Sequence, residues 1–264
     1  MHPMLFTAIK AARRAGDIIT RASRDLERVQ ISRKGHNDYV TEVDKAVEEA
    51  IIEILADAYP DHSFLGEESG DRQPEAEKVG KGGVEYQWVI DPLDGTTNFI
   101  HGFPHYAVSI AALHRGQAVH AVVYDPTSNE IFTASRGNGA FLDDRRIRVS
   151  EQRNYYEALV GAHVTGSAGA LTTSSPFASL LTECAAVRRT GSTVLDLVYV
   201  ASGRLDGFCA TNLKPWDMAA GALIAAEAGA LVGDFEGEQS WYKTGSILVA
   251  TPKLFPQMIM HLQG

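Results

Sequence analysis

The residues best suited to chemistry lie in the segment WVIDPLDGTTNF, residues 88–99. An apolar strand is predicted to end at Asp91, and Asp94 follows it, directly before Gly95 and Thr96. Carboxylate oxygens suit Mg²⁺, while backbone N–H groups that open a helical turn can hold an anionic oxygen. The glycine allows the backbone to approach that oxygen closely. The pattern indicates a phosphate bridged to the protein by metal; an ordinary Asp-rich turn is the alternative that this segment alone leaves open.

Two further segments place acidic residues where they can join this site. Residues 66–69 read GEES and follow the apolar pair Phe64-Leu65; one glutamate can point into the site, or both can lie on the surface. Residues 215–217 read PWD before an apolar segment, and proline suits the first position of a helix. Asp217 then falls in the first helical turn, where an acid also complements the helix dipole. Each segment alone leaves its structural explanation open.

Helices and strands are expected around these segments. Apolar residues at helical spacing predict helices at 3–22, 43–58, 176–184, 192–201, 215–228 and 253–262. Apolar runs between turn residues predict strands at 87–90, 106–113, 119–124, 130–134, 139–142, 146–149, 158–163, 230–232 and 246–250. Residues 69–86 are typical of a surface loop, and 164–176 show no clear pattern. Helices, then an antiparallel run, then alternating helices and strands indicate a layered α/β architecture.

Composition excludes several classes of protein. The 264 residues are 45% hydrophobic and 22% charged, which is typical of a globular chain. No apolar run approaches the roughly 20 residues that cross a bilayer, so we expect no membrane partner. A net charge of −9 argues against general nucleic-acid binding, which needs a basic face. The two cysteines, Cys184 and Cys209, form no CxxC pair; we therefore expect reduced thiols and a cytoplasmic protein.

Taken together, the acidic segments resemble the inositol monophosphatase family of metal-dependent, lithium-sensitive phosphatases. The segments that match this family's three motifs, in order and at sensible separations, are GEES at 66–69, DPLDGTTNF at 91–99 and WDMAAG at 216–221. The resemblance extends over nearly the whole chain. The segments that resemble the bacterial SuhB branch of the family are MHPML at the start, KGHNDYVTEVD at 34–44, RRTGS at 188–192 and GRLDGF at 203–208.

The resemblance implies a magnesium site. Its implied metal ligands are the side chains of Glu67, Asp91, Asp94 and Asp217 and the backbone carbonyl of Leu93. The family binds two to three Mg²⁺ ions at such a site, and Li⁺ inhibits it. Two ions can lower the pKa of a bound water, neutralise the phosphoryl oxygens and stabilise the leaving oxygen.

The resemblance also implies roles for residues around the metal. Glu67, Thr96 and Asp44 are the implied catalytic residues, and Thr96 and Asp44 form a dyad that orients and helps to activate the attacking water. Lys34 would approach the phosphate or a third metal ion. The residues implied to bind the phosphate or the alcohol part of the substrate are Lys34, Leu93, Asp94, Gly95, Thr96, Arg188, Gly191, Ser192, Thr193 and Asp217.

The fold and reaction of the family follow as expectations. The fold class is α/β (α+β), a five-layered αβαβα sandwich of the inositol monophosphatase and fructose-1,6-bisphosphatase type. One phosphatase domain is expected over 1–264, with a metal and phosphate half at about 1–150 and a substrate half at about 151–264. The implied reaction is the hydrolysis of inositol 1-phosphate by in-line attack of water, with no covalent enzyme intermediate. A small phosphorylated polyol or sugar is the expected substrate, and a homodimer the expected assembly.

Two alternatives stay open. One is a related phosphatase that acts on a sugar bisphosphate or a 3′-phosphorylated nucleotide. It gains weight because Ala210 stands seven residues before Asp217, where the family commonly has a glutamate that contacts inositol hydroxyls. The other is a transcription antitermination (Nus) factor with residual phosphatase activity. The arginine pair Arg188-Arg189 and the basic helix at 3–22 are then the candidate surfaces for transcription-complex proteins.

Overall fold

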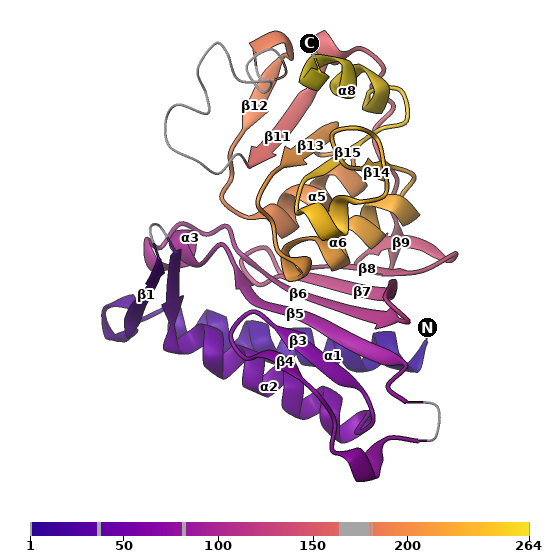
Figure 1. The fold of residues 1–264 in the computed structure, drawn as a ribbon. Helices are drawn as coiled ribbons and strands as arrows, with labels where there is room; N and C mark the ends of the chain where they lie inside the picture. Colours follow the sequence, from indigo (N-terminus) through magenta and orange to yellow (C-terminus); the bar gives the residue numbers. More distant parts are fainter. Residues whose placement is uncertain (1, 36–37, 81–82, 164–179, 181, 264) are drawn as a thin grey trace.

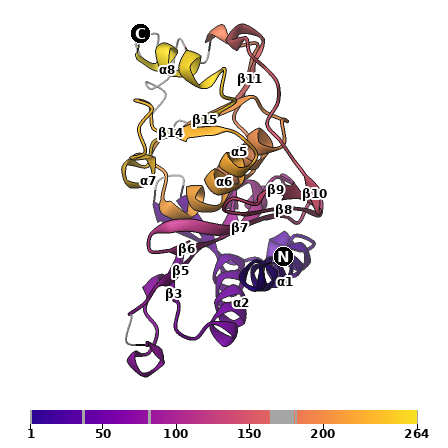
Figure 2. The same ribbon diagram turned by 90° about the vertical axis from the view of Figure 1, so that its right-hand side faces the viewer.

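The chain folds into five layers, which alternate helix, sheet, helix, sheet and helix (Figures 1 and 2). The computed structural model describes residues 2–35, 38–80, 83–163, 180 and 182–263. The predicted five-layered αβαβα sandwich is therefore confirmed. Along the described residues, no helix combines the length and apolar character that crossing a membrane requires.

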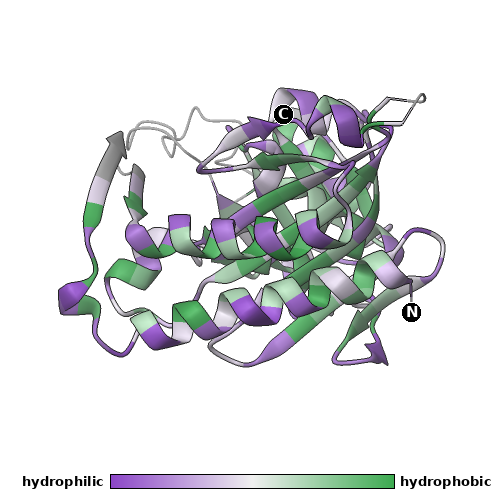
Figure 3. Cartoon of the chain, turned by 90° about the horizontal axis from the view of Figure 1, so that it is seen from below, coloured by the Kyte–Doolittle hydropathy of each residue, from purple (hydrophilic) through white to green (hydrophobic). Residues whose placement is uncertain are grey.

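The first layer holds two long helices, α1 (Pro3–Ala22) and α2 (Glu42–Ala58). They lie side by side across the outer face of the larger sheet, with hydrophilic residues recurring along their exposed surfaces (Figure 3). Thr41 caps α2, because its hydroxyl accepts a hydrogen bond from the Val43 N–H at 3.1 Å. The short hairpin of β1 (Ile31–Gly35) and β2 (Asp38–Thr41) leads into α2.

The larger sheet has eight strands in the order β10-β9-β8-β7-β6-β5-β3-β4. Their bounds are β3 (Ser63–Gly66), β4 (Gly70–Arg72), β5 (Tyr86–Asp94), β6 (Ala107–His114), β7 (Gln117–Asp125), β8 (Glu130–Ser135), β9 (Gly139–Leu142) and β10 (Arg145–Arg146). Strands β3 and β5 pair in parallel, and the other neighbours pair antiparallel. The parallel pair matters most for function, because the carboxyl ends of both strands reach the same edge of the sheet.

The middle layer consists of α5 (Thr193–Ala201) and α6 (Pro215–Glu227), which lie between the two sheets (Figure 2). The two helices approach closely at Gly221, where an added Cβ would lie 2.6 Å from the Leu197 Cβ. Helix α6 contacts β5, β6, β7 and β8 of the larger sheet. The largest hydrophobic cluster of buried residues is formed here and joins the two halves of the chain.

The second sheet has five strands in the order β12-β11-β13-β15-β14, and α8 (Phe255–Gln263) covers its outer face. Its strands are β11 (Leu159–His163), β12 (Ala186–Arg188), β13 (Gly207–Ala210), β14 (Leu231–Gly233) and β15 (Ile247–Ala250). The remaining short elements are η1 (Leu26–Arg28), η2 (Ala76–Lys78), α3 (Thr96–Ile100), η3 (Tyr155–Glu157) and α7 (Trp241–Thr244).

The predicted helices at 3–22, 43–58, 192–201, 215–228 and 253–262 are confirmed. The strand predicted at 146–149 is wrong, because β10 covers only Arg145–Arg146 before the chain leaves the hairpin. The surface loop predicted at 69–86 is wrong in part, since β4 extends the sheet by pairing with β3. The short strands β1, β2, β3, β12 and β13 were not predicted. Region 164–176 and nearly all of the helix predicted at 176–184 lie outside the described residues.

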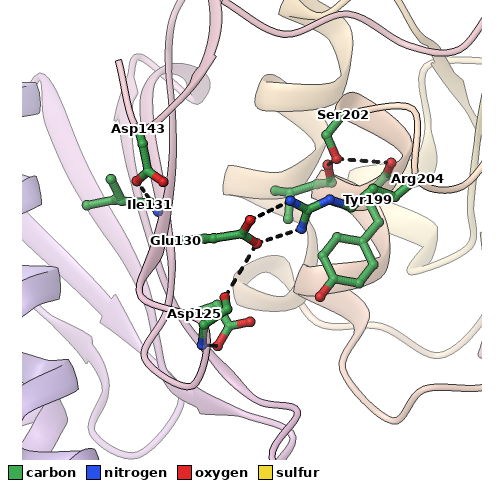
Figure 4. A network of polar contacts seen from close by, with 9 residues as sticks. Asp125, Glu130, Ile131, Asp143, Tyr199, Ser202 and Arg204 are labelled. Atoms are coloured by element: carbon green, nitrogen blue, oxygen red, sulfur yellow. Dashed lines mark hydrogen bonds and ion pairs between the residues drawn. The ribbon is translucent and has the colours of Figure 1, made fainter. Parts of the chain in front are cut away.

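A bidentate ion pair links the larger sheet to the middle layer (Figure 4). Arg204, just after α5, donates to both carboxylate oxygens of Glu130 at the start of β8, at 2.6 and 2.5 Å. The Arg204 guanidinium also lies over the Tyr199 ring, 5.1 Å from its centre. Hydrogen bonding from Arg204 lowers the pKa of the Glu130 carboxyl. The pair therefore favours the ionised carboxylate and fixes α5 against the sheet.

Replacing Glu130 by Gln should lower the free energy of unfolding by about 1 kcal/mol, because the bidentate ion pair is lost. The loss is no larger because the side chains of Arg204 and Glu130 are 37% and 22% exposed, and solvent screens their attraction. The lowered pKa means that this stabilisation is present above the carboxyl's ordinary value of 4.5 and is lost as the pH falls through the folded value. Urea unfolding at pH 7 and pH 3 measures both effects. Glu85→Gln breaks an exposed pair with Arg115 and is the control; an equal loss in both variants would contradict the prediction.

Candidate active site

The site begins where the parallel strands β3 and β5 end together. Gly66 pairs with Ile90 across the two strands, and the Glu67 N–H donates to the Ile90 carbonyl at 3.2 Å. Glu67 therefore follows β3 beside Asp91 on β5. A turn found far from Asp91 in the sequence is thus brought to it by strand pairing.

The two aspartates of the DPLD segment occupy an irregular strand end. Pairing of β5 with β6 is interrupted between Asp91 and Asp94. The Asp91 carboxylate accepts a hydrogen bond from the Leu93 N–H at 3.0 Å, which closes a local turn. Asp91 is buried, whereas Asp94 is partly accessible. The irregularity lets both acids lie at the same end of the sheet.

Helix α6 supplies Asp217 in its first turn. The Asp217 carboxylate accepts from the Lys214 N–H at 2.7 Å, which completes a cap at the helix start. The Ser109 hydroxyl donates to the Trp216 carbonyl at 3.3 Å, and Ser109 pairs with Asp91 across β5 and β6. The first turn of α6 is therefore held over the sheet next to Asp91.

Electrostatics show that these four carboxylates act on one another. Burial raises the pKa of Asp91 well above its usual range, and the charges of Glu67, Asp94 and Asp217 raise it further. Burial raises the pKa of Asp217 to about 8, with added repulsion from Asp94 and Glu67. Burial raises the pKa of Asp94 to about 6, against the hydrogen bonds that it accepts. Cations placed among them would relieve this repulsion.

The donors present fit a hard cation. Carboxylate and carbonyl oxygens are the ligands that Mg²⁺ prefers, and the Leu93 carbonyl lies in the same turn. Within the described part of the chain, no three His, Cys, Asp or Glu side chains already surround one point at metal-binding distance. Binding a metal ion here therefore requires the carboxylates to turn toward it.

The predicted partners Asp44 and Thr96 meet beside these acids. The Thr96 hydroxyl lies 3.1 Å from the Asp44 Oδ1 and 3.0 Å from the Leu93 carbonyl oxygen. The other oxygen of Asp44 accepts from the Thr41 N–H at 2.8 Å and so caps α2. Burial raises the pKa of Asp44. Gly95, with φ at +95°, turns the chain into α3; an added Cβ would lie 3.0 Å from the His105 carbonyl oxygen.

Asp94 connects the site to α5. Its Oδ2 accepts from the Ser192 hydroxyl at 2.5 Å and from the Val194 N–H at 2.8 Å. The Ser192 and Thr193 side chains are buried, so the Ser192 hydroxyl faces Asp94. Gly191 is the exposed residue of this turn. A substrate that reaches the turn would therefore meet the Gly191 backbone first.

The remaining predicted residues, Lys34, Arg188 and Ala210, lie in strands β1, β12 and β13. Lys34 is in strand β1, but its side chain lies outside the described part of the structure. Arg188 ends β12 and is exposed, with its guanidinium donating to the Val187 carbonyl at 3.1 Å. Ala210 ends β13 and is fully buried.

Asn98 is a site residue that the sequence reasoning missed. Its amide Nδ2 donates to the His105 carbonyl at 2.8 Å and to the Thr190 carbonyl at 3.0 Å. It also occupies the space where a Cβ of Gly191 would lie. Asn98 thus joins α3 to the turn before α5. Its place in the DGTTN segment was the available signal.

Curated relatives resemble the chain along its whole length. The sequence model of the inositol monophosphatase family matches residues 1–263. The putative Nus factor SuhB of Neisseria meningitidis serogroup B is 47% identical over 261 residues, which cover 98% of this chain and 97% of that protein. The Nus factor SuhB of Salmonella typhimurium strain LT2 is 46% identical over 265 residues, with 100% and 97% covered.

Solved structures agree with this assignment. The extragenic suppressor protein SuhB of Bartonella henselae has a TM-score of 0.93 at 37% identity, with 99% of both chains covered. The inositol monophosphatase of Anabaena (Nostoc) sp. PCC 7120 has a TM-score of 0.82 at 33% identity, with 98% of this chain and 94% of that chain covered. A family match along nearly the full sequence, on the same fold, shows that this chain belongs to the inositol monophosphatase family.

Proposed function

We propose that this chain is a Mg²⁺-dependent hydrolase of phosphate monoesters whose substrate is a small phosphorylated polyol, inositol 1-phosphate first. The observation that carries the proposal is the cluster of Glu67, Asp91, Asp94 and Asp217, in which burial and then mutual repulsion raise the pKa values of Asp91 and Asp217, beside the Thr96–Asp44 pair. Family membership supports a phosphatase.

The proposed roles of the acids follow from their positions. Glu67, Asp91, Asp94 and Asp217 would hold two to three Mg²⁺ ions together with the Leu93 carbonyl. When bound, these ions neutralise the phosphoryl oxygens and lower the pKa of the attacking water. Li⁺ would inhibit by competing for one of these positions. When Thr96 donates its single hydroxyl proton to Asp44, the Leu93 carbonyl keeps its lone pairs for a metal ion.

The Thr96–Asp44 pair would orient the water. When the Thr96 hydroxyl donates to Asp44 Oδ1, its oxygen keeps a lone pair for a proton of the water. Because Thr41 holds the other oxygen of Asp44, the pair has little freedom to turn. The water is thereby aimed along the line of attack, and the group that leaves departs from the opposite side of the phosphorus.

The substrate would be held from both halves of the chain. Backbone N–H groups of Gly95 and Thr96 would donate to the phosphate, helped by Lys34. The alcohol part would meet the Gly191 backbone and the exposed Arg188. Ala210 supplies no carboxylate for hydroxyl groups, so we expect other sugar phosphates to be hydrolysed alongside inositol 1-phosphate.

Phosphate release from three substrates tests this proposal. We expect turnover of inositol 1-phosphate that requires Mg²⁺ and is inhibited by Li⁺, with lower rates on fructose 1,6-bisphosphate and adenosine 3′,5′-bisphosphate. A higher rate on either bisphosphate would move the proposal to the sugar-bisphosphate or 3′-nucleotide class. Mg²⁺-independent or absent release from all three would overturn it.

A second candidate function is supported by the curated relatives, which are named Nus factors. We propose that this chain also binds proteins of a transcription complex, through Arg188 and Arg189, both exposed, and the basic face of α1. Capture of transcription proteins by an Asp94→Asn variant, which we expect to keep the fold but lose turnover, would support this role. Retained capture after Arg188 and Arg189 are both replaced by Ala would exclude that surface.

The assembly and location are proposals as well. We propose a homodimer in the cytoplasm, as implied by the family and by cysteines kept reduced. Cys184 and Cys209 are unpaired in the structure. Sedimentation at several concentrations measures the assembly directly.

A further inference from the structure

Helix α2 carries a second buried carboxylate one turn beyond Asp44. Glu48 is 2% exposed and lies on the same face of the helix as Asp44, since residues four apart are neighbours on a helix. A buried carboxylate is costly unless it is well hydrogen-bonded.

The partners of Glu48 lie in the GEES turn between β3 and β4. Its Oε2 accepts from the Glu68 N–H at 2.9 Å, and its Oε1 accepts from the Ser69 N–H at 2.8 Å. Both oxygens therefore bind backbone amides of the two residues that follow Glu67. The Glu67 N–H itself is held by the Ile90 carbonyl. The backbone around Glu67 is thus fixed from both sides.

Gly66 makes this arrangement possible. A Cβ added at Gly66 would lie 2.5 Å from the Glu48 Cδ and Oε2 and 2.6 Å from Oε1. At contacts below 3.0 Å one of the groups must shift, so a side chain at position 66 would have to displace the carboxylate that fills this space. The position of the Glu48 carboxylate therefore depends on a glycine at position 66.

We propose that Glu48 is a positioning residue, which fixes the GEES turn so that the Glu67 carboxylate is delivered to the metal site beside Asp91. The inference rests on the proposed function, because it takes Glu67 to be a metal ligand. Helix α2 then serves the site twice: Asp44 orients Thr96, and Glu48 orients Glu67.

The chemistry requires a carboxylate at position 48. Two converging N–H donors need two acceptor oxygens, and an ionised group accepts more strongly than a neutral one. In Glu48→Gln, the amide NH₂ would face one backbone N–H, so one hydrogen bond is replaced by a donor–donor contact. The turn would lose its fixed geometry while the side chain keeps its volume.

We expect Glu48→Gln to weaken Mg²⁺ binding by about 10- to 100-fold, as for other groups that orient metal ligands. Saturating Mg²⁺ should restore kcat to within about threefold, because the Thr96–Asp44 pair is unchanged. Mg²⁺ affinity is read from the increase in Tm on titration and from calorimetry. Glu49→Gln, exposed and adjacent on α2, is the matched control and should match the wild type.

Gly66→Ala tests this dependence from the other side. Its Cβ should displace the Glu48 carboxylate and reproduce the loss of affinity. In a chain that already carries Glu48→Ala, the same Gly66→Ala change should have little further effect, because nothing is left to displace. Equal losses in the two backgrounds would show that Gly66 acts independently and would overturn the pairing.

Amide hydrogen exchange in the metal-free chain separates this inference from the proposed function. Glu48→Gln should speed exchange at Glu68 and Ser69 by about tenfold or more, while amides of α1 keep wild-type rates. This readout holds even if the wild type proves to bind no Mg²⁺, which would defeat the proposed function alone. Unchanged Glu68 and Ser69 exchange, or unchanged Mg²⁺ affinity beside a wild type that binds Mg²⁺, would overturn the positioning role.

Discussion

Replacing Asp217 by Asn is expected to abolish turnover and, in the absence of metal, to stabilise the fold. Phosphate release should fall by about 10³-fold or more, about 4 kcal/mol in transition-state stabilisation, because a metal ligand loses its charge. Asn still accepts the hydrogen bond from the Lys214 N–H, so the start of α6 is kept. Its amide can also donate to the neighbouring carboxylates, which removes a source of repulsion.

The sign of the stability effect follows from the raised pKa. In the folded, metal-free chain the pKa of Asp217 is about 8, against an ordinary 3.8. A raised folded pKa gives stability that is fully present below pH 3.8 and is lost as the pH rises through about 8. Asp217→Asn does not titrate there. Its advantage over the wild type should therefore grow between pH 4 and pH 8, to about 1 kcal/mol or more.

Urea unfolding in EDTA at several pH values measures the difference in stability between Asp217→Asn and the wild type. With Mg²⁺ present, the wild type should be the more stable of the two. Asp57→Asn removes an exposed acid from α2 and is the control; it should leave turnover and the pH dependence of stability unchanged. An Asp217→Asn chain that is less stable than the wild type at pH 8 without metal would show that repulsion among these acids does not limit the fold.

The sequence was informative where the signal is local. Asp91, Asp94 and Gly95 lie within one short segment, and their role as a strand end followed by a turn could be predicted from residue types alone. The long helices were equally clear, because the apolar faces of α1 and α2 repeat at helical spacing over many residues. The layered α/β architecture followed from the pattern of helices and strands, and the family from the resemblance of the three acidic motifs.

Contacts between distant segments could not be predicted in the same way. The parallel pairing of β3 with β5, which sets Glu67 beside Asp91, involves a strand of only four residues. The hydrogen bond from Ser192 to Asp94 joins residues 98 positions apart. Glu48 was hidden because an acid on a helix is usually exposed; its spacing of four from Asp44 was the only sequence signal. The strand pairing, the hydrogen bond and the burial of Glu48 all depend on tertiary packing and not on residue type.

Thr96 is the residue at which a loss of turnover should occur without a loss of metal. Thr96→Val keeps the shape of the side chain but removes the hydroxyl that lies between Asp44 Oδ1 and the Leu93 carbonyl. We expect kcat to fall by about 10²- to 10³-fold, because the attacking water loses the group that orients it. KM and the Mg²⁺ affinity should change little, because the carboxylates and the Gly95 turn remain.

Three single variants and one double variant identify the cause of the loss of turnover. Thr96→Ser keeps the hydroxyl and should retain most of the rate, while Thr97→Val, at an exposed neighbouring threonine, should leave kcat unchanged. Asp44→Asn should lower kcat too, and combining it with Thr96→Val should add little, since both act through one hydrogen bond. Asp44 also caps α2, so its effect on kcat must be read beside its unfolding curve. If Thr96→Val lowered the Mg²⁺ affinity and kcat in parallel, the hydroxyl would be supporting the Leu93 carbonyl at the metal and not the attacking water.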